Sequence, residues 1–258
     1  MKKDLVFPFG SKLKPVLQKD KTPKKVFVLG VYASAIHAKW IGSDGKIKVR
    51  ALAIASEPYI FWRGESADAE KAIAAINMPK ELGRLVPADG LNGPSGLALD
   101  NLFLAPLGYK REDAWLCDLL PYACINPSQR LALDRAYEPL REQYNLPEVT
   151  IGGTPKNFAD DKRVAEILIE LKQSEANKIV LLGDMPIKYF LSKVTKGKYN
   201  KLSDFGTTKA AYGKEQKVEI DGKVYSVIAL AHPRQAGQLG RSSKDWFELH
   251  SNWVRKIK

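Results

Sequence analysis

Short apolar runs that each end in a small or polar residue recur along the chain and indicate buried β-strands. The first, residues 25–31 (KVFVLGV), is too short for a helix and rich in β-branched residues. Similar runs occupy residues 114–125, 178–184 and 227–233. Together they predict four strands that are distant from one another along the chain.

Segments with apolar residues at helical spacing separate these runs, and two Asp-Gly pairs predict β-hairpins over Asp44-Gly45 and Asp221-Gly222. Ser95 is suited to cap the second helix, and Asp160 or Asp161 the fourth. The predicted helices cover residues 67–77, 96–108, 127–147, 160–174, 185–194 and 244–254, with residues 79–95 as a loop.

Alternating strands and helices favour a mainly parallel sheet covered on both faces. We therefore predict an α/β fold: a three-layer α/β/α arrangement with a central, mainly parallel four-stranded sheet and hairpin additions. Residues 25–258 are expected to form this single domain. Residues 1–24, with Pro8, Pro15 and Pro23, form a basic N-terminal arm that either wraps the domain or stays loose.

Ligands of such sheets bind at the carboxyl ends of the strands. The four predicted strands end in GVYAS, CDLLPY, GDMP and AHPR, each with a polar residue where the apolar run stops. Four such ends in one chain predict a pocket. Neither G-x-G-x-x-G nor a Walker sequence is present, which argues against a dinucleotide or nucleoside triphosphate site.

The formal net charge of +12 favours a polyanionic partner. Residues 1–25 carry eight lysines against two aspartates, a second basic stretch runs from Lys188 to Lys217, and the chain ends in RKIK. A charge that serves only solubility is the alternative. We favour nucleic acid.

Neither a metal site nor an iron–sulfur cluster is expected, because two cysteines and three histidines at wide spacing supply too few ligands. Cys117 and Cys124 are expected to be buried and reduced. We predict no cofactor. The absence of a long apolar run predicts no membrane partner and an intracellular, cytoplasmic, soluble protein, associated with the nucleoid if it binds DNA. We expect a monomer.

Four segments together resemble the uracil-DNA glycosylase superfamily over roughly residues 25–254. VFVLGVYAS resembles the strand and active-site loop of its first motif, and GLALDNLFLAPLGYKREDAWLCDLLPY resembles the helix, turn and strand that end at the base-recognising asparagine. SEANKIVLLGDMPIKYFL resembles the third strand with its helix. ALAHPRQAGQLGRSS resembles the final motif, a strand that ends in His-Pro and a loop that enters DNA.

The resemblance implies a DNA base-excision glycosylase that flips its target base into a tight pocket. It places His232 where a neutral imidazole stabilises the departing base, as other fixed donors stabilise oxyanions. It also implies an aromatic platform for the base, for which Tyr59, Phe61 and Trp62 are candidates. Further base-pocket candidates are the loop residues Gly30, Val31, Tyr32 and Ala33.

Residues 234–240 correspond in this resemblance to the loop that enters DNA. Gln235, Gln238 or Leu239 would act as the wedge that fills the gap left by the flipped base. Arg234 and Arg241 are suited to contact phosphates.

Two departures from the family pattern bear on activity. The first loop lacks the carboxylate or amide that positions the attacking water, so Ser34, His37, Asp118 or Asp184 would have to replace it. Asp118 also stands where the family has asparagine, and an ionised carboxylate only accepts hydrogen bonds. A base with an exocyclic amine, cytosine-like or otherwise modified, then fits better than uracil.

Two further interpretations stay open. A scaffold that has lost hydrolysis would bind nucleic acid without cleaving it. The same pocket could instead serve an enzyme that acts on a free nucleoside, nucleotide or other small molecule.

Overall fold

The computed structural model of the protein describes residues 4–239 and 242–257. The chain packs as two compact units, each made of three separate stretches. Unit 1 contains residues 1–16, 33–94 and 122–156, and unit 2 contains residues 17–32, 95–121 and 157–258. The predicted N-terminal arm and the predicted domain thus each contribute to both units.

A five-stranded sheet forms the centre of unit 2, in the order β5-β1-β6-β8-β7. Its strands are β1 (Val26–Tyr32), β5 (Ala114–Leu120), β6 (Lys178–Leu182), β7 (Gln216–Ile220) and β8 (Lys223–Leu230). β5, β1, β6 and β8 run parallel, whereas β7 pairs antiparallel with β8. The predicted α/β class with a mainly parallel sheet is confirmed. The predicted count of four holds only for the parallel strands, because the hairpin over Asp221-Gly222 adds β7.

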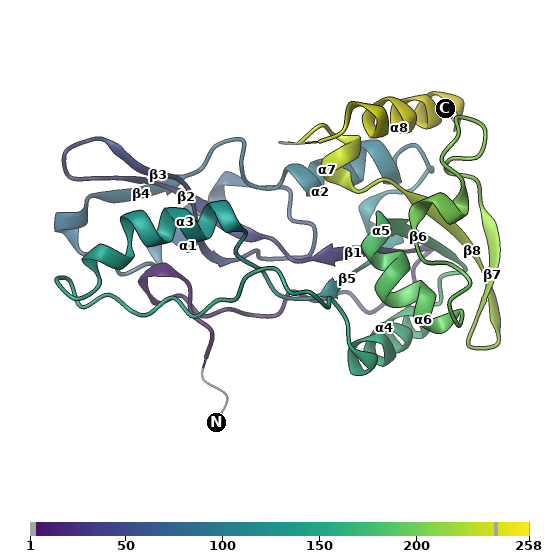
Figure 1. Ribbon diagram of the computed structural model, residues 1–258, viewed down its shortest axis with the longest axis horizontal. Coiled ribbons are helices and arrows are strands. Elements are labelled where there is room, and N and C mark those ends of the chain that lie inside the picture. Colours follow the sequence, from purple (N-terminus) through teal and green to yellow (C-terminus); the bar gives the residue numbers. More distant parts are fainter. Residues whose placement is uncertain (1–3, 240–241, 258) are drawn as a thin grey trace. The chain divides into compact units, whose positions relative to one another are not determined.

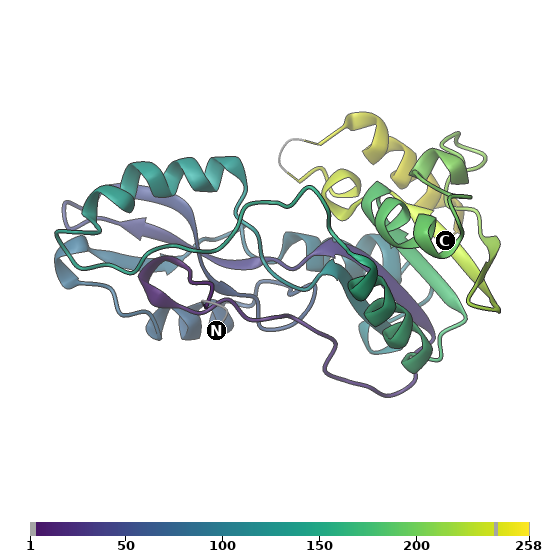
Figure 2. The same cartoon turned by 60° about the horizontal axis from the view of Figure 1, so that its bottom comes forward.

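Helices cover both faces of this sheet, as the predicted layering requires (Figures 1 and 2). α4 (Asp161–Gln173), α5 (Asp184–Pro186) and α6 (Ser192–Val194) lie on one face. α7 (Pro233–Ala236) and α8 (Lys244–Ile257) lie on the other. The central strands are consequently buried on both sides, with 0–1% exposure for the side chains of Phe27, Val28, Leu29, Ile179, Val180, Leu181, Val227, Ile228, Ala229 and Leu230.

Two of the predicted helices contain π-helical stretches. α2 (Pro94–Ala98) continues as η3 (Leu99–Leu104), so the helix begins at Pro94 and Ser95 is not its cap. α5 likewise continues as η6 (Ile187–Leu191) before α6. Asp160 caps α4 as predicted, because its carboxylate accepts the backbone N–H of Arg163 at 2.8 Å.

The strand order of unit 2 reverses between β1 and β6. Along the chain, β5 is placed on one side of β1, and the later strands β6 and β8 are placed on the other. In open α/β sheets ligands bind in the crevice at such a switch point, outside the carboxyl ends of the strands. The topology therefore directs attention to the ends of β1, β6 and β8.

Unit 1 is built on a three-stranded antiparallel sheet in the order β3-β2-β4. Its strands are β2 (Ala35–Ile41), β3 (Ile47–Ser56) and β4 (Arg84–Pro87), and its α-helices are α1 (Ser66–Ala74) and α3 (Pro127–Ala136). The hairpin predicted over Asp44-Gly45 is confirmed. The prediction of a loop throughout residues 79–95 is wrong for β4, an edge strand that tolerates Pro87 at its end.

The N-terminal arm is anchored in unit 1 by two phenylalanines near its start. Phe7 and Phe9 are 0% and 5% exposed in the core of unit 1. The ring of Phe9 lies edge-on to Trp40, at 5.6 Å between centroids, and to Tyr137, at 5.1 Å. Phe7 and Phe9 therefore hold the beginning of the arm in the core of unit 1.

Candidate functional site

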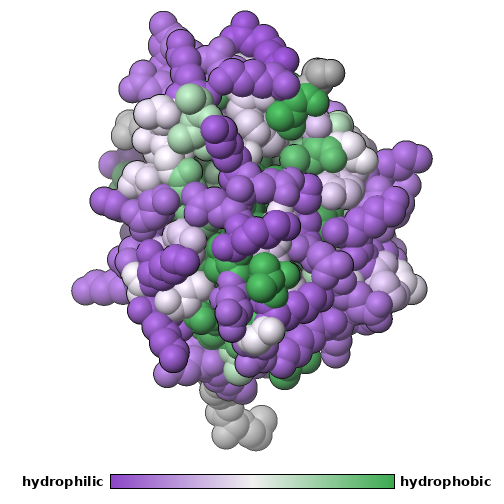
Figure 3. All heavy atoms as spheres, turned by 90° about the vertical axis from the view of Figure 1, so that its right-hand side faces the viewer, coloured by the Kyte–Doolittle hydropathy of each residue, from purple (hydrophilic) through white to green (hydrophobic). Residues whose placement is uncertain are grey.

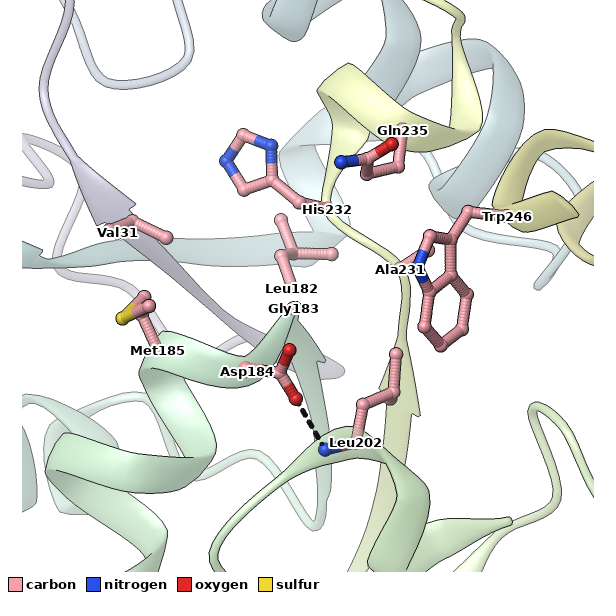
Figure 4. A pocket seen from close by; sticks show the side chains of 10 residues that line it. All are labelled: Val31, Leu182, Gly183, Asp184, Met185, Leu202, Ala231, His232, Gln235 and Trp246. Atoms are coloured by element: carbon pink, nitrogen blue, oxygen red, sulfur yellow. Dashed lines mark hydrogen bonds between the residues drawn. The ribbon is translucent and has the colours of Figure 1, made fainter. Parts of the chain in front are cut away.

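A pocket of about 200 Å³ lies at the switch point of unit 2, at the carboxyl ends of β1, β6 and β8 (Figure 4). This is smaller than the roughly 300–1,000 Å³ of pockets that enclose drug-sized ligands, so only a small ligand fits inside it. Its walls combine apolar surface with a carboxylate, an imidazole and an amide. The lining residues are Val31, Leu182, Gly183, Asp184, Met185, Leu202, Ala231, His232, Gln235 and Trp246.

His232 is the N-cap of α7 and projects into this pocket. Its Nδ1 accepts the backbone N–H of Arg234 at 3.1 Å. Burial, with a smaller effect of the Arg234 charge, lowers the pKa of His232 to about 4. The ring is therefore neutral at pH 7, and because Nδ1 is an acceptor, the proton resides on Nε2. The pocket thus holds a neutral N–H donor.

Gly183 lets β6 end directly against His232. Its φ of +90° lies in the left-handed region that favours glycine. A Cβ atom at this position would stand 3.2 Å from Cβ of His232. The backbone N–H of Gly183 donates to the carbonyl of Leu230 at 2.7 Å, which continues the β6–β8 pairing to the edge of the pocket.

Asp184 supplies the carboxylate of the pocket. Its Oδ1 accepts the backbone N–H of Leu202 at 2.7 Å, which ties the segment after α6 to the end of β6 (Figure 4). Gly183 occupies the N-cap of α5, and Asp184 is its first helical residue.

An aromatic cluster adjoins the pocket residues along the chain. Tyr32, which follows Val31, is 39% exposed, and its ring stacks on Phe158 at 6.1 Å and 17°. Phe158 packs in turn on Tyr189 at 5.6 Å. Nζ of Lys188 lies 5.2 Å from the ring centroid of Tyr189. Partly exposed rings beside a cation form the kind of surface on which nucleobases stack.

Asp118 and Gly30 face each other in register between β5 and β1. Asp118 is 3% exposed and lies two residues before the end of β5. Arg163 holds this strand end, since its Nη2 donates to the carbonyl of Asp118 at 2.7 Å and its Nε to that of Leu119 at 3.1 Å. The predicted roles of Gly30 and Asp118 in base recognition stay predictions.

The other candidates from the first loop and the aromatic run belong to unit 1. The backbone N–H of Ser34, which follows Ala33, donates to Oε1 of Glu57 at 2.9 Å. The hydroxyl of Tyr59 lies 2.6 Å from Oε1 of Glu65, and Phe61 has a φ of +52°. Trp62 is 1% exposed within the core.

The segment predicted to enter DNA begins as a helix rather than a loop. Gln235 lies in α7 on the pocket wall, and its Oε1 accepts the backbone N–H of Ser243 at 2.6 Å. Arg234 is exposed, and its Nε donates to the carbonyl of Leu239 at 3.2 Å. Gln238 is exposed and Leu239 half-buried, whereas Arg241 lies outside the described residues.

His37 does not line this pocket. It lies in unit 1, where its Nε2 is 2.8 Å from Nε2 of Gln129. Burial lowers its pKa to about 4. Cys117 and Cys124 are both free thiols; Cys117 is buried as predicted, whereas Cys124 is only half-buried.

A basic segment of unit 2 follows the pocket residues of β6 and α5 along the chain and ends in β7. Residues 188–217 carry eight lysines against Asp204 and Glu215, a net charge of +6. This segment includes Leu202 of the pocket wall. Figure 3, which faces the β7 side of Figure 1, shows mainly hydrophilic side chains there. The exposed lysines are Lys188, Lys193, Lys196, Lys198, Lys201, Lys209, Lys214 and Lys217.

No family model matches the sequence, and a search of curated proteins finds no match either. Within residues 4–239 and 242–257, no group of three His, Cys, Asp or Glu side chains could hold a metal ion. No described helix combines the length and apolar character needed to span a bilayer.

Sequence reasoning missed Met185, Leu202 and Trp246 as pocket residues. Met185 directly follows a predicted strand end and could have been found there. Leu202 and Trp246 lie far from any strand end along the chain, and their local pattern is that of ordinary core positions. Only the tertiary fold brings them to the switch point.

Proposed function

We propose that this protein is a DNA base-excision glycosylase that hydrolyses the N-glycosidic bond of a flipped, uracil-like or otherwise modified base. Water supplies the oxygen that bonds to C1′ of the sugar, the C1′–N bond breaks, and the base leaves with the bonding electrons. The base anion then takes up a proton from water. The protein would stabilise the charge that develops on the base and on the sugar.

The observation that carries this proposal is the neutral His232 in a small pocket at the switch point. A neutral N–H donor can bind an oxygen atom on which negative charge grows, without needing to be protonated at pH 7. Its acceptor Nδ1 is held by the backbone of Arg234, so the donor Nε2–H is fixed in advance. Such preorganisation is what stabilisation of a departing anion requires.

Asp184 is the strongest candidate for orienting the attacking water. It is the carboxylate on the wall of the same pocket as His232, and Leu202 fixes one of its oxygen atoms. It would replace the carboxylate that the first loop lacks. A negative charge here would also stabilise the positive charge that develops on the sugar.

The basic segment and the aromatic cluster support nucleic acid as the substrate. Exposed lysines favour a phosphate backbone. The stacked rings of Tyr32 and Phe158 favour an unpaired base, and Tyr32 directly follows the pocket residue Val31 along the chain.

The direct test is incubation with oligonucleotides that each hold uracil, hypoxanthine, xanthine or another altered base, followed by alkaline cleavage at abasic sites. We expect strand breaks at one or more of these bases. No cleavage with any of them would refute the proposal.

The missing first-loop carboxylate favours a second candidate, a nucleic-acid-binding protein without hydrolysis. It predicts salt-dependent binding of DNA, with affinity falling linearly in a log–log plot, and no abasic product. Binding that does not respond to salt would exclude this candidate.

A further inference from the structure

Behind the pocket, a buried chain of hydrogen bonds connects α8 with the end of β8. Nε2 of His250 lies 2.9 Å from the carbonyl of Leu102, and its Nδ1 lies 2.7 Å from the hydroxyl of Tyr212. The same hydroxyl lies 2.8 Å from the backbone nitrogen of Ala231. Ala231 is the residue immediately before His232.

Only one arrangement of protons satisfies all three contacts. A carbonyl only accepts, so Nε2 of His250 carries a proton and donates to Leu102. Burial lowers the pKa of His250 to about 4, so the ring is neutral and its Nδ1 accepts from the hydroxyl of Tyr212. The oxygen of Tyr212 is then available to accept the backbone N–H of Ala231.

The last residue pair of the β6–β8 ladder is Leu182 with Leu230. The N–H of Ala231 is the first one beyond the ladder, and Ala231 is only 2% exposed. A buried backbone N–H needs a partner. Here that partner is the hydroxyl of Tyr212. Tyr212 is 4% exposed, and it is held in turn by His250, which is 1% exposed.

The packing around Tyr212 leaves this chain of bonds little freedom. A Cβ atom at Gly213, where φ is +73°, would stand 2.2 Å from Nε1 of Trp253 in α8. The His250 ring packs on Phe103 at 4.5 Å and on Trp253 at 5.1 Å. The backbone beside Tyr212 therefore lies directly on α8.

We propose that Tyr212 and His250 are positioning residues for His232, because they fix the backbone from which its imidazole enters the pocket. A second tie acts from the other side, where Ser243 donates its backbone N–H to Gln235 in α7. That this positioning speeds base release rests on the proposed function. That it fixes the orientation of the His232 ring does not.

The test is nitrogen-15 NMR of the imidazole rings as a function of pH, which is practicable because the chain has three histidines. We compare the unaltered protein with Tyr212→Phe. In the unaltered protein we expect a His232 ring protonated on Nε2 at pH 7. In Tyr212→Phe, a less constrained and more hydrated ring should raise the pKa of His232 by about one unit toward its ordinary value.

Tyr225→Phe is the matched control, since Tyr225 is a buried tyrosine of β8, the strand that leads to Ala231. It lies six residues before Ala231, roughly 20 Å away at about 3.3 Å per residue. This variant should leave His232 unchanged. A folded Tyr212→Phe protein in which the His250 signals shift and those of His232 do not would overturn the proposal.

Two further measurements separate the possible failures. If the protein releases a base, Tyr212→Phe should slow single-turnover release about tenfold, as expected for a displaced catalytic group. If no base is released, the proposed function fails, while the NMR result still decides whether Tyr212 positions His232.

If Tyr212→Phe does not fold, amide hydrogen exchange in the unaltered protein decides instead. The backbone N–H of Ala231 should then be as protected from exchange as that of Leu230. Exchange as fast as that of an exposed loop would overturn the proposal.

Discussion

Gly183 and His232 approach each other so closely that a Cβ atom on residue 183 would stand 3.2 Å from Cβ of His232. Gly183 also has a φ of +90°. Position 183 therefore favours glycine for two reasons: its left-handed backbone conformation and its close contact with His232.

Gly183→Ala should destabilise the protein by about 1–3 kcal/mol, because a left-handed φ is strained for alanine. It should also displace His232 and slow base release. Gly222→Ala is the control, since Gly222 has a φ of +76° in the β7–β8 turn with nothing within 4 Å of the added Cβ. Urea unfolding and single-turnover rates measure both effects. Equal activity in the two variants would contradict the account.

Asp184→Asn should slow base release by about 10²-fold while leaving stability nearly unchanged, taking the loss of one preorganised group in an active site as the guide. The asparagine oxygen can still accept the N–H of Leu202, but it carries no charge for water or sugar. Asp204→Asn is matched to it, because Asp204 accepts the backbone N–H of Asn200 at 2.7 Å in the same segment and does not line the pocket. A normal rate in Asp184→Asn would exclude Asp184 from catalysis.

The three histidines should make the fold less stable in mild acid. Burial lowers the pKa of His37, His232 and His250 to about 4, from an ordinary value of 6.5. Between these values the unfolded chain binds protons that the folded protein does not. Stability is therefore complete above pH 6.5 and is lost as the pH falls toward 4, by up to about 3 kcal/mol per histidine.

Urea unfolding at pH 7, 6 and 5 measures this loss. We expect the midpoint to fall at each step, and His250→Gln, which cannot titrate, to show a shallower fall. A midpoint that stays constant from pH 7 to 5 would mean that the rings are not buried in the folded state.

The aromatic cluster of Tyr32, Phe158 and Tyr189 should contribute to binding of single-stranded DNA. Tyr189→Ala should weaken binding by about 1–3 kcal/mol, the usual value of one base–aromatic stack. Tyr189→Phe retains the ring and should bind normally. Fluorescence anisotropy with a labelled oligonucleotide at fixed salt measures both. Equal affinity of Tyr189→Ala and the unaltered protein would remove this ring from the interface.

The parallel strands could be predicted from sequence because each is a short apolar run buried on both faces. Four strand ends, those of β1, β5, β6 and β8, could be predicted to meet for the same reason, since a parallel sheet brings its carboxyl ends to one edge. Residues at the ends of β1, β6 and β8 line the pocket, whereas none of its lining residues comes from β5. Val31 and His232 do line one pocket there. His232 was recognisable because it follows such a strand and precedes Pro233.

The division into two units could not be predicted, because three separate stretches form each unit and no linker marks their borders. Phe9, Trp40 and Tyr137 meet in one core from positions 128 residues apart at the extremes, and local pattern does not encode that meeting. The hydrogen bond between Tyr212 and His250 could not be predicted either, because the two residues are distant along the chain and each alone resembles an ordinary core position.

The most direct measurement of the central claim is the pH dependence of single-turnover base release by the unaltered protein and by His232→Ala. A neutral His232 donor predicts a rate that is flat from about pH 6 to 8, and a rate in His232→Ala lower by about 10²-fold. A rate that falls tenfold per pH unit above 6.5 would require a protonated imidazole, and an unchanged rate in His232→Ala would remove His232 from the reaction. Either result would contradict the account.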